Sequence, residues 1–141
     1  MELRFAGVGS AFTTKEYWQS NMIASHDGKN LLIDCGGDIR FSLAELNMSH
    51  KDIGAVYISH LHADHIGGLE WLGFCTYFDP KFIRRPKMYI ADKLVDDLWE
   101  TLKSGMQLSK GKTTLHDFFD VNPIKLNESF NFGNADFSQW K

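Results

Sequence analysis

The spacing of apolar positions predicts strands and helices in alternation. "LRFAGV" (Leu3–Val8) reads as a strand, and "NMIAS" and "NLLID" flank "HDGK", in which Asp27-Gly28 is a strong hairpin signal. The unbroken apolar run Leu31–Ile33 is typical of a strand covered on both faces. "GAVYIS" (Gly54–Ser59) and "PKMYIA" (Pro86–Ala91) predict two further buried strands.

Helical spacing follows three of these strands. Asp38 is a candidate N-cap for a helix with apolar side chains at i, i+4 and i+7, namely Ile39, Leu43 and Leu46. A second helix is expected over Ile66–Phe78, and a third from Asp92 to about Lys103. "SGMQLSKGKTT" is expected to be a polar loop, and the sequence after it reads as β and loop. The order β-β-β-α-β-α-β-α predicts an α/β layered fold.

Composition narrows the class of protein. A chain of 141 residues with 43% hydrophobic content suits one folded domain, 1–141. The net charge of −3 offers no overall basic field for a long nucleic acid. Cys35 and Cys75 form no disulfide framework, which indicates a reducing, cytoplasmic compartment. No run reaches the roughly 18 apolar residues of a membrane span, so no membrane association is expected.

The candidate chemistry lies in "VYISHLHADHIGGLEW". His60, His62, Asp64 and His65 fall within six residues, directly after a predicted strand. Positions two apart do not share a helix face, so we expect these four residues to lie in a tight loop. Such a loop can direct His60 and His62 at one centre and Asp64 and His65 at a neighbouring one. Imidazoles with a carboxylate suit two divalent metal ions, zinc first and manganese or iron as alternatives.

"HLHADHIGG" resembles the signature of the metallo-β-lactamase superfamily. In order and spacing, "LRFAGVGSAF", "NLLIDCGGDI" and "ISHLHADHIGGLEWL" resemble the ribonuclease Z branch, which includes phosphodiesterases that act on cyclic nucleotides. The resemblance covers about residues 1 to 80 well and the remainder loosely.

This resemblance implies a metallo-β-lactamase-like αβ/βα sandwich and a two-metal hydrolase. His60 and His62 would bind one metal, and Asp64 and His65 the other, with Asp64 also positioning the attacking water as a catalytic residue. Asp34 would support the histidine loop, although simple capping of its strand end explains it equally well. Ser59 could hydrogen-bond within that loop.

The sequence departs from the family pattern after the first half. A complete member supplies further histidines and a bridging aspartate from a second half, and none of these can be placed here. We therefore expect an N-terminal half of a longer enzyme. Completion by a second protein, or a degenerate half without chemistry, are the alternatives. Bare sheet edges also favour a homo-oligomer.

Three other residues are candidates for substrate binding. Lys110 and Lys112 lie in the polar loop, which in this family could cover the active site, and His116 is the remaining downstream histidine. "RRPK" (Arg84–Lys87) is interpreted as a solvated turn, being too short for a nucleic-acid footprint.

The leading hypothesis is a metal-dependent phosphodiesterase or nuclease. The acidic balance favours a small nucleotide over a structured RNA as the phosphodiester substrate. One alternative is a non-catalytic half-domain that acts as a binding or assembly module. Another is a lactonase, thioesterase or β-lactamase on the same fold.

Overall fold

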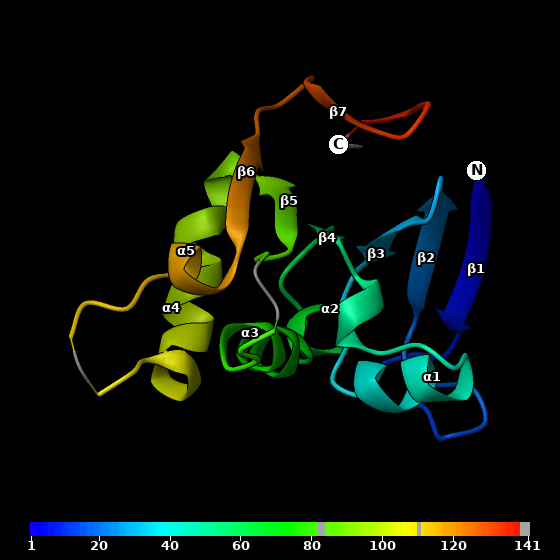
Figure 1. Cartoon of the computed structure of the whole chain (residues 1–141), viewed down its shortest axis with the longest axis horizontal. Coiled ribbons are helices and arrows are strands. Elements are labelled where there is room, and N and C mark those ends of the chain that lie inside the picture. Colours follow the sequence, from blue (N-terminus) through cyan, green and yellow to red (C-terminus); the bar gives the residue numbers. More distant parts are fainter. Residues whose placement is uncertain (82–83, 110, 139–141) are drawn as a thin grey trace.

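The computed structural model describes residues 1–81, 84–109 and 111–138. A six-stranded sheet runs in sequence order (Figure 1) and comprises β1 (Glu2–Gly7), β2 (Asn21–His26), β3 (Lys29–Ile33), β4 (Ala55–Ile58), β5 (Lys87–Ala91) and β6 (Asp120–Ile124). β1, β2 and β3 pair antiparallel, whereas β3, β4, β5 and β6 pair parallel. The carboxyl ends of four strands therefore lie along one edge of the sheet.

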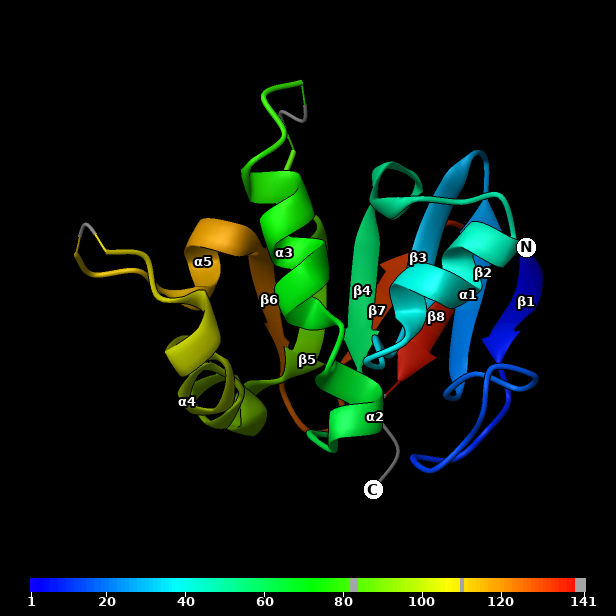
Figure 2. The same cartoon turned by 90° about the horizontal axis from the view of Figure 1, so that it is seen from below.

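Helices cover one face of this sheet and a hairpin lies on the other. Figure 2 shows α1 and α3 in front of the sheet and the two-stranded hairpin behind it. The helices are α1 (Ile39–Glu45), α2 (Ala63–Ile66), α3 (Leu69–Tyr77), α4 (Val95–Met106) and α5 (Leu115–Phe118). The 3-10 turns are η1 (His50–Asp52) and η2 (Asp92–Leu94), and the hairpin is β7 (Ser129–Phe132) with β8 (Ala135–Ser138). None of the helices in the described ranges has the length and apolar character needed to cross a bilayer.

The main core lies between the sheet and the helices. Its fully buried side chains come from the inner strands and from α1, α3 and α5, and include Leu32, Val56, Ile58, Leu43, Leu72 and Phe118. The continuous apolar runs of β3 and β4 fit this position, because a strand covered on both faces has no solvent side.

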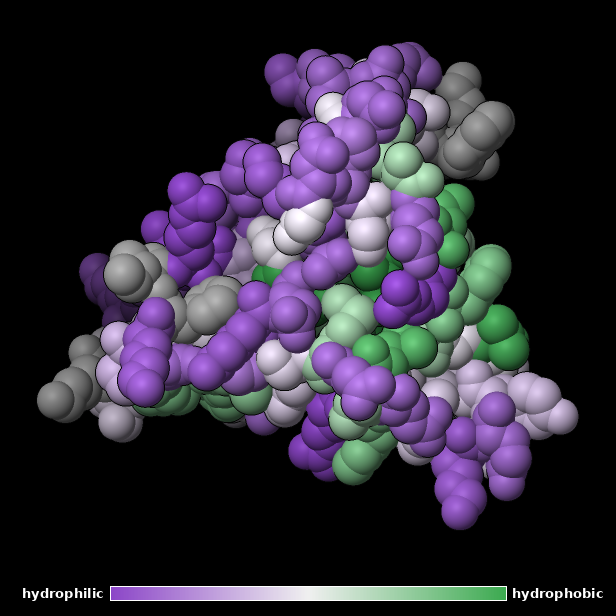
Figure 3. Space-filling model, turned by 45° about the vertical axis from the view of Figure 1, so that its right-hand side comes forward, coloured by the Kyte–Doolittle hydropathy of each residue, from purple (hydrophilic) through white to green (hydrophobic). Residues whose placement is uncertain are grey.

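The opposite face of the sheet is only partly covered. Phe130 of the hairpin stacks on Tyr89 with ring centroids 4.0 Å apart and joins a second, smaller core with Ala24 and Leu31. Further along this face, Leu3 and Phe5 of β1 are 57% and 60% exposed. The space-filling view shows apolar surface between hydrophilic flanks (Figure 3). Homo-oligomerisation through a bare sheet edge stays a prediction.

Most expected elements are present, but several local expectations were wrong. The helix expected over Ile66–Phe78 is divided into α2 and α3, and the one expected from Asp92 begins with the 3-10 turn η2. Asp38 precedes α1, but its side chain makes no cap hydrogen bond. α4 extends to Met106 and so includes the start of the predicted polar loop. Residues 115–118 are helical because Thr114 and Asp117 form a capping box, which overrides the weak β pattern. The loop expected to carry the histidine cluster ends in a short helix, α2.

Candidate functional site

The candidate site forms where β3 and β4 end side by side. These strands are parallel, with Ile33 opposite Tyr57, so the residues after each strand emerge together at the carboxyl edge of the sheet. The backbone N–H of Asp34 donates to the carbonyl of Tyr57 at 2.8 Å and continues the ladder by one residue. Sites in α/β folds commonly lie outside this edge.

Asp34 links the two strand ends. Its buried carboxylate accepts hydrogen bonds from the backbone N–H of Ser59 at 2.8 Å and from the Ser59 hydroxyl at 2.7 Å. It also lies 2.7 Å from Nδ1 of His65. Asp34 adopts a left-handed backbone conformation with φ of 62°, which Asp tolerates better than most residues. This is the arrangement that a supporting role requires.

The four expected ligands lie together in the histidine loop, which we define as Ser59–Ile66. The His60 ring centroid lies 3.9 Å from that of His65 and 4.7 Å from that of His62. Asp64 Oδ2 lies 3.3 Å from His65 Nε2. His60 and His62 precede α2, whereas Asp64 and His65 belong to it (Figure 1). The single helical turn of α2 thus gives the last two side chains a direction that an extended loop would not.

Backbone contacts fix the histidine loop against the turn that follows β3. The N–H of Cys35 donates to the carbonyl of His65 at 2.7 Å, and the N–H of Gly68 donates to the carbonyl of Cys35 at 2.8 Å. A Cβ on Gly36 would lie 2.4 Å from the backbone oxygen of Asp64, closer than atoms can approach. The close approach of the two backbones therefore requires glycine at position 36, whereas a Cβ on Gly37 would meet nothing closer than 3.7 Å.

Two residues that sequence reasoning missed hold this turn from the other side. The side-chain oxygen of Asn21 accepts from the N–H of Gly36 at 2.9 Å, and that of Gln19 accepts from Gly37 at 2.7 Å. Asn21 is 2% exposed although it begins a strand. No local sequence pattern marks this position, because its burial arises only in the folded structure.

The electrostatics of the cluster favour neutral His60. Burial lowers the pKa of His60, the neighbouring His65 and His62 lower it further, and the Asp34 and Asp64 carboxylates oppose them. A neutral imidazole keeps the lone pair that a metal or a proton-transfer step needs.

The donor chemistry of the cluster fits a divalent metal, but the present arrangement does not complete a centre. In residues 1–81, 84–109 and 111–138, no group of three or more His, Cys, Asp or Glu side chains is placed to hold a metal ion. Both ring nitrogens of His65 are engaged, Nδ1 with Asp34 and Nε2 with Asp64. A metal bound through Nε2 would take the place of the Asp64 contact and leave the Asp34 contact intact.

The other predicted site residues lie elsewhere. His116 is exposed on α5, which precedes β6 and so lies toward the amino ends of the parallel strands. Lys112 is exposed in the loop between α4 and α5, and both views place this loop far from α2 (Figures 1 and 2). Lys110 lies outside the described residues. The cavity beside His65 measures only ≈ 80 Å³.

Comparison with known proteins identifies relatives along the whole chain. The family model described as "Anti-Pycsar protein Apyc1" matches residues 1–141. The Apyc1 of Paenibacillus harenae is 43% identical over 128 residues, which cover 90% of this chain and 52% of the relative. That of Bacillus phage BSP38 is 36% identical over 130 residues, covering 88% and 49%. The chain thus spans about half the length of the curated relatives it matches.

Solved structures confirm the metallo-β-lactamase fold. A diphosphatase of the PhnP family aligns with a TM-score of 0.73 and 21% identity, covering 96% of this chain and 55% of that one. The short form of human tRNase Z aligns with a TM-score of 0.65 and 24% identity, covering 89% and 45%. Zn²⁺-bound PqqB from Methylobacterium extorquens aligns with a TM-score of 0.67 and 18% identity, covering 92% and 48%. The expected relationship and fold class are confirmed, with about half of each neighbour matched.

Proposed function

Because this chain belongs to the Apyc1 family of anti-Pycsar proteins, we propose that it carries the metal-binding half of a phosphodiester hydrolase. The observation that carries this proposal is the Asp34 network, in which one buried carboxylate contacts both Ser59 and His65. A carboxylate on Nδ1 of a histidine orients the ring and directs Nε2 toward a metal.

Each residue of the histidine loop has a proposed role. His60 and His62 would hold one divalent ion, and Asp64 and His65 a second. The ions, zinc in the first instance, would supply a hydroxide at neutral pH and stabilise the charge that develops on the phosphoryl oxygens. The Ser59 hydroxyl, 3.0 Å from Nδ1 of His60, holds that ring while it also donates to Asp34. Asp64 would orient the attacking water.

The substrate we propose is a cyclic mononucleotide. The motifs before and within the histidine loop resemble the branch that includes cyclic-nucleotide phosphodiesterases. The chain carries a net charge of −3, which is a poor match for a long RNA but no obstacle to one small phosphodiester beside metal ions. The neighbours' own activities do not transfer at their level of identity, so the substrate has to be measured.

The test uses the chain alone and a chimera that joins it to the part of the Paenibacillus harenae relative that it does not cover. Both proteins are loaded with Zn²⁺ or Mn²⁺ and assayed with a cyclic mononucleotide, bis(p-nitrophenyl) phosphate and a precursor tRNA. We expect the chimera to hydrolyse the first two. His62→Ala should lower the rate at least ~100-fold by removing a ligand, whereas His26→Ala removes an imidazole at the far end of β2 and should not.

Three outcomes would contradict the proposal. Cleavage of precursor tRNA alone would replace the small nucleotide by a structured RNA. Equal metal binding by His62→Ala and the unsubstituted chain would remove the histidine loop from the chemistry and favour a non-catalytic module. Hydrolysis of a β-lactam or thioester with every phosphodiester intact would assign the fold to a different hydrolase.

A further inference from the structure

A basic cavity lies at the edge of the sheet opposite the histidine loop. It measures ≈ 1030 Å³, near the upper end of typical ligand pockets. The first residues of β4 and β5 line it, whereas the histidine loop follows the last residue of β4. Four residues of strand separate the two places by about 13 Å. Ligand binding in this cavity can therefore be tested independently of the proposed hydrolysis.

Six cationic side chains line this cavity, namely Lys29, Lys51, Lys81, Arg84, Arg85 and Lys87, against one carboxylate, Asp120. They come from the start of β3, from η1, from the segment before β5 and from β5 itself. The sequence shows only the short cluster before β5, which we interpreted as a solvated turn. The fold gathers further lysines around it, on a chain whose net charge is −3.

Most of these cations have no carboxylate partner. Lys51 lies 3.5 Å from Asp79, and the Arg85 guanidinium donates to the backbone oxygen of His116. Among the residues that the structure describes, no ion pair involves Lys29, Lys81, Arg84 or Lys87. Like charges gathered without counter-charges repel one another, so an anion placed among them gains their combined attraction.

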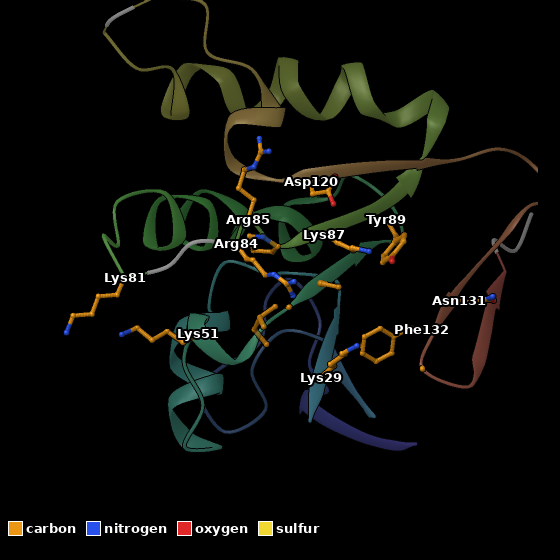
Figure 4. Close-up of a pocket in the computed structure, with 15 residues that line it drawn as sticks. Lys29, Lys51, Lys81, Arg84, Arg85, Lys87, Tyr89, Asp120, Asn131 and Phe132 are labelled. Atoms are coloured by element: carbon orange, nitrogen blue, oxygen red, sulfur yellow. The ribbon is translucent and has the colours of Figure 1, made fainter. Parts of the chain in front are cut away.

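The directions of the side chains define where that anion would lie. Figure 4 shows the charged end of Lys29 beside the ring of Phe132 and that of Lys87 beside Tyr89, with the Arg84 guanidinium between these residues and Lys51. Lys51 and Lys81 lie together at one end of the cavity (Figure 4). A line of charges with an arginine fork at its centre suits an extended anion with several phosphate groups better than a single carboxylate.

We propose that this cavity binds a small anion with a chain of phosphates, either inorganic polyphosphate or the phosphate chain of a nucleotide. Arg84 provides the bidentate contact, and Lys29 and Lys87 provide point charges on either side. The ligand would stabilise the folded protein, because it draws together three segments that otherwise repel.

The test is isothermal titration of the chain with tripolyphosphate, ATP and adenosine, in the presence of a chelator so that no metal contributes. We expect binding of tripolyphosphate, of ATP or of both, weakened by added salt, and no binding of adenosine. The triple variant Lys29→Gln, Arg84→Gln, Lys87→Gln should bind at least ~10-fold more weakly. A matched variant, Lys15→Gln, Lys93→Gln, Lys103→Gln, removes the same charge outside the cavity and should bind normally.

Conservative replacements separate charge from folding. Lys29→Arg with Lys87→Arg keeps the charge and should keep binding, and thermal melting of the triple variant should show an intact fold. Binding of tripolyphosphate but not ATP would identify inorganic polyphosphate as the ligand class. Binding of ATP as well would identify the phosphate chain of a nucleotide. Equal affinity of the triple and matched variants, or binding of single-stranded RNA but of neither small anion, would overturn the proposal.

Discussion

Replacing Asp34 by asparagine tests how the site is built. Both residue types tolerate the left-handed backbone that Asp34 adopts, so this change leaves the turn after β3 unstrained. An amide cannot accept a hydrogen bond through both of its heavy atoms, as the carboxylate does from Ser59 and His65. In Asp34→Asn the side-chain nitrogen would donate to Nδ1 of His65 and leave the proton on Nε2, where a metal needs a lone pair.

The expected loss follows from this change of tautomer. Removing a hydrogen-bond partner of a metal-bound histidine typically lowers metal affinity ~10- to 100-fold, which corresponds to about 1.4–2.7 kcal/mol. Asp34→Ala should weaken metal binding as much and also destabilise the fold. It leaves the half-buried donors of Ser59 and His65 without their acceptor and forces alanine into a left-handed backbone, which itself costs about 1–2 kcal/mol.

The assay is competition for Zn²⁺ against a chromophoric chelator, with the tautomer of His65 read from nitrogen chemical shifts. Thermal melting separates a loss of affinity from a loss of folding, because Asp34→Asn should melt closer to the unsubstituted protein than Asp34→Ala does. Unchanged metal affinity in Asp34→Asn, with the His65 tautomer also unchanged, would refute the role of the carboxylate.

Three further predictions concern the same region. Gly36→Ala places a Cβ 2.4 Å from a backbone oxygen of the histidine loop. It should lower the unfolding free energy, measured by denaturant titration, by about 1–3 kcal/mol. The control Gly54→Ala, whose Cβ would have its nearest neighbour at 3.8 Å, should be nearly neutral. Burial and a nearby carboxylate raise the pKa of Cys35, so the native protein should leave this thiol unalkylated until it unfolds; modification of both Cys35 and Cys75 in the native state would contradict this. Because burial and the neighbouring histidines lower the pKa of His60 in the folded state, the unfolded chain binds a proton first, and the unfolding free energy of the metal-free protein should fall as pH drops below about 6.5. A melting temperature that rises on such acidification would count against that assignment.

Sequence reasoning succeeded where a local pattern determines the structure. Asp27-Gly28 closes the β2–β3 hairpin with both residues at positive φ, as its type predicts. The spacing of His60, His62, Asp64 and His65 predicts that they lie together, as they do in the structure, while their joint chemistry stays a prediction. Asp34 could also be predicted as a support residue, because a polar residue that follows one buried parallel strand lies close to the residues that follow the neighbouring strand.

Features that depend on tertiary contact could not be predicted. Asn21 supports Gly36 through a contact between positions fifteen residues apart, and nothing in its neighbourhood distinguishes it. The basic cavity joins lysines from separate segments, so only the short cluster near Arg84 was visible. The short helix that carries His116 depends on the capping box of Thr114 and Asp117, whereas the apolar pattern around it favours β and loop.

The most direct test of the central claim is the metal content of the purified chain. The protein would be equilibrated with Zn²⁺, freed of loosely bound ions, and analysed by elemental mass spectrometry together with its native mass. The account predicts about one or two zinc ions per chain, lost in His62→Ala and retained in His26→Ala. A folded chain that retains no metal, or that retains as much after His62→Ala, would contradict it.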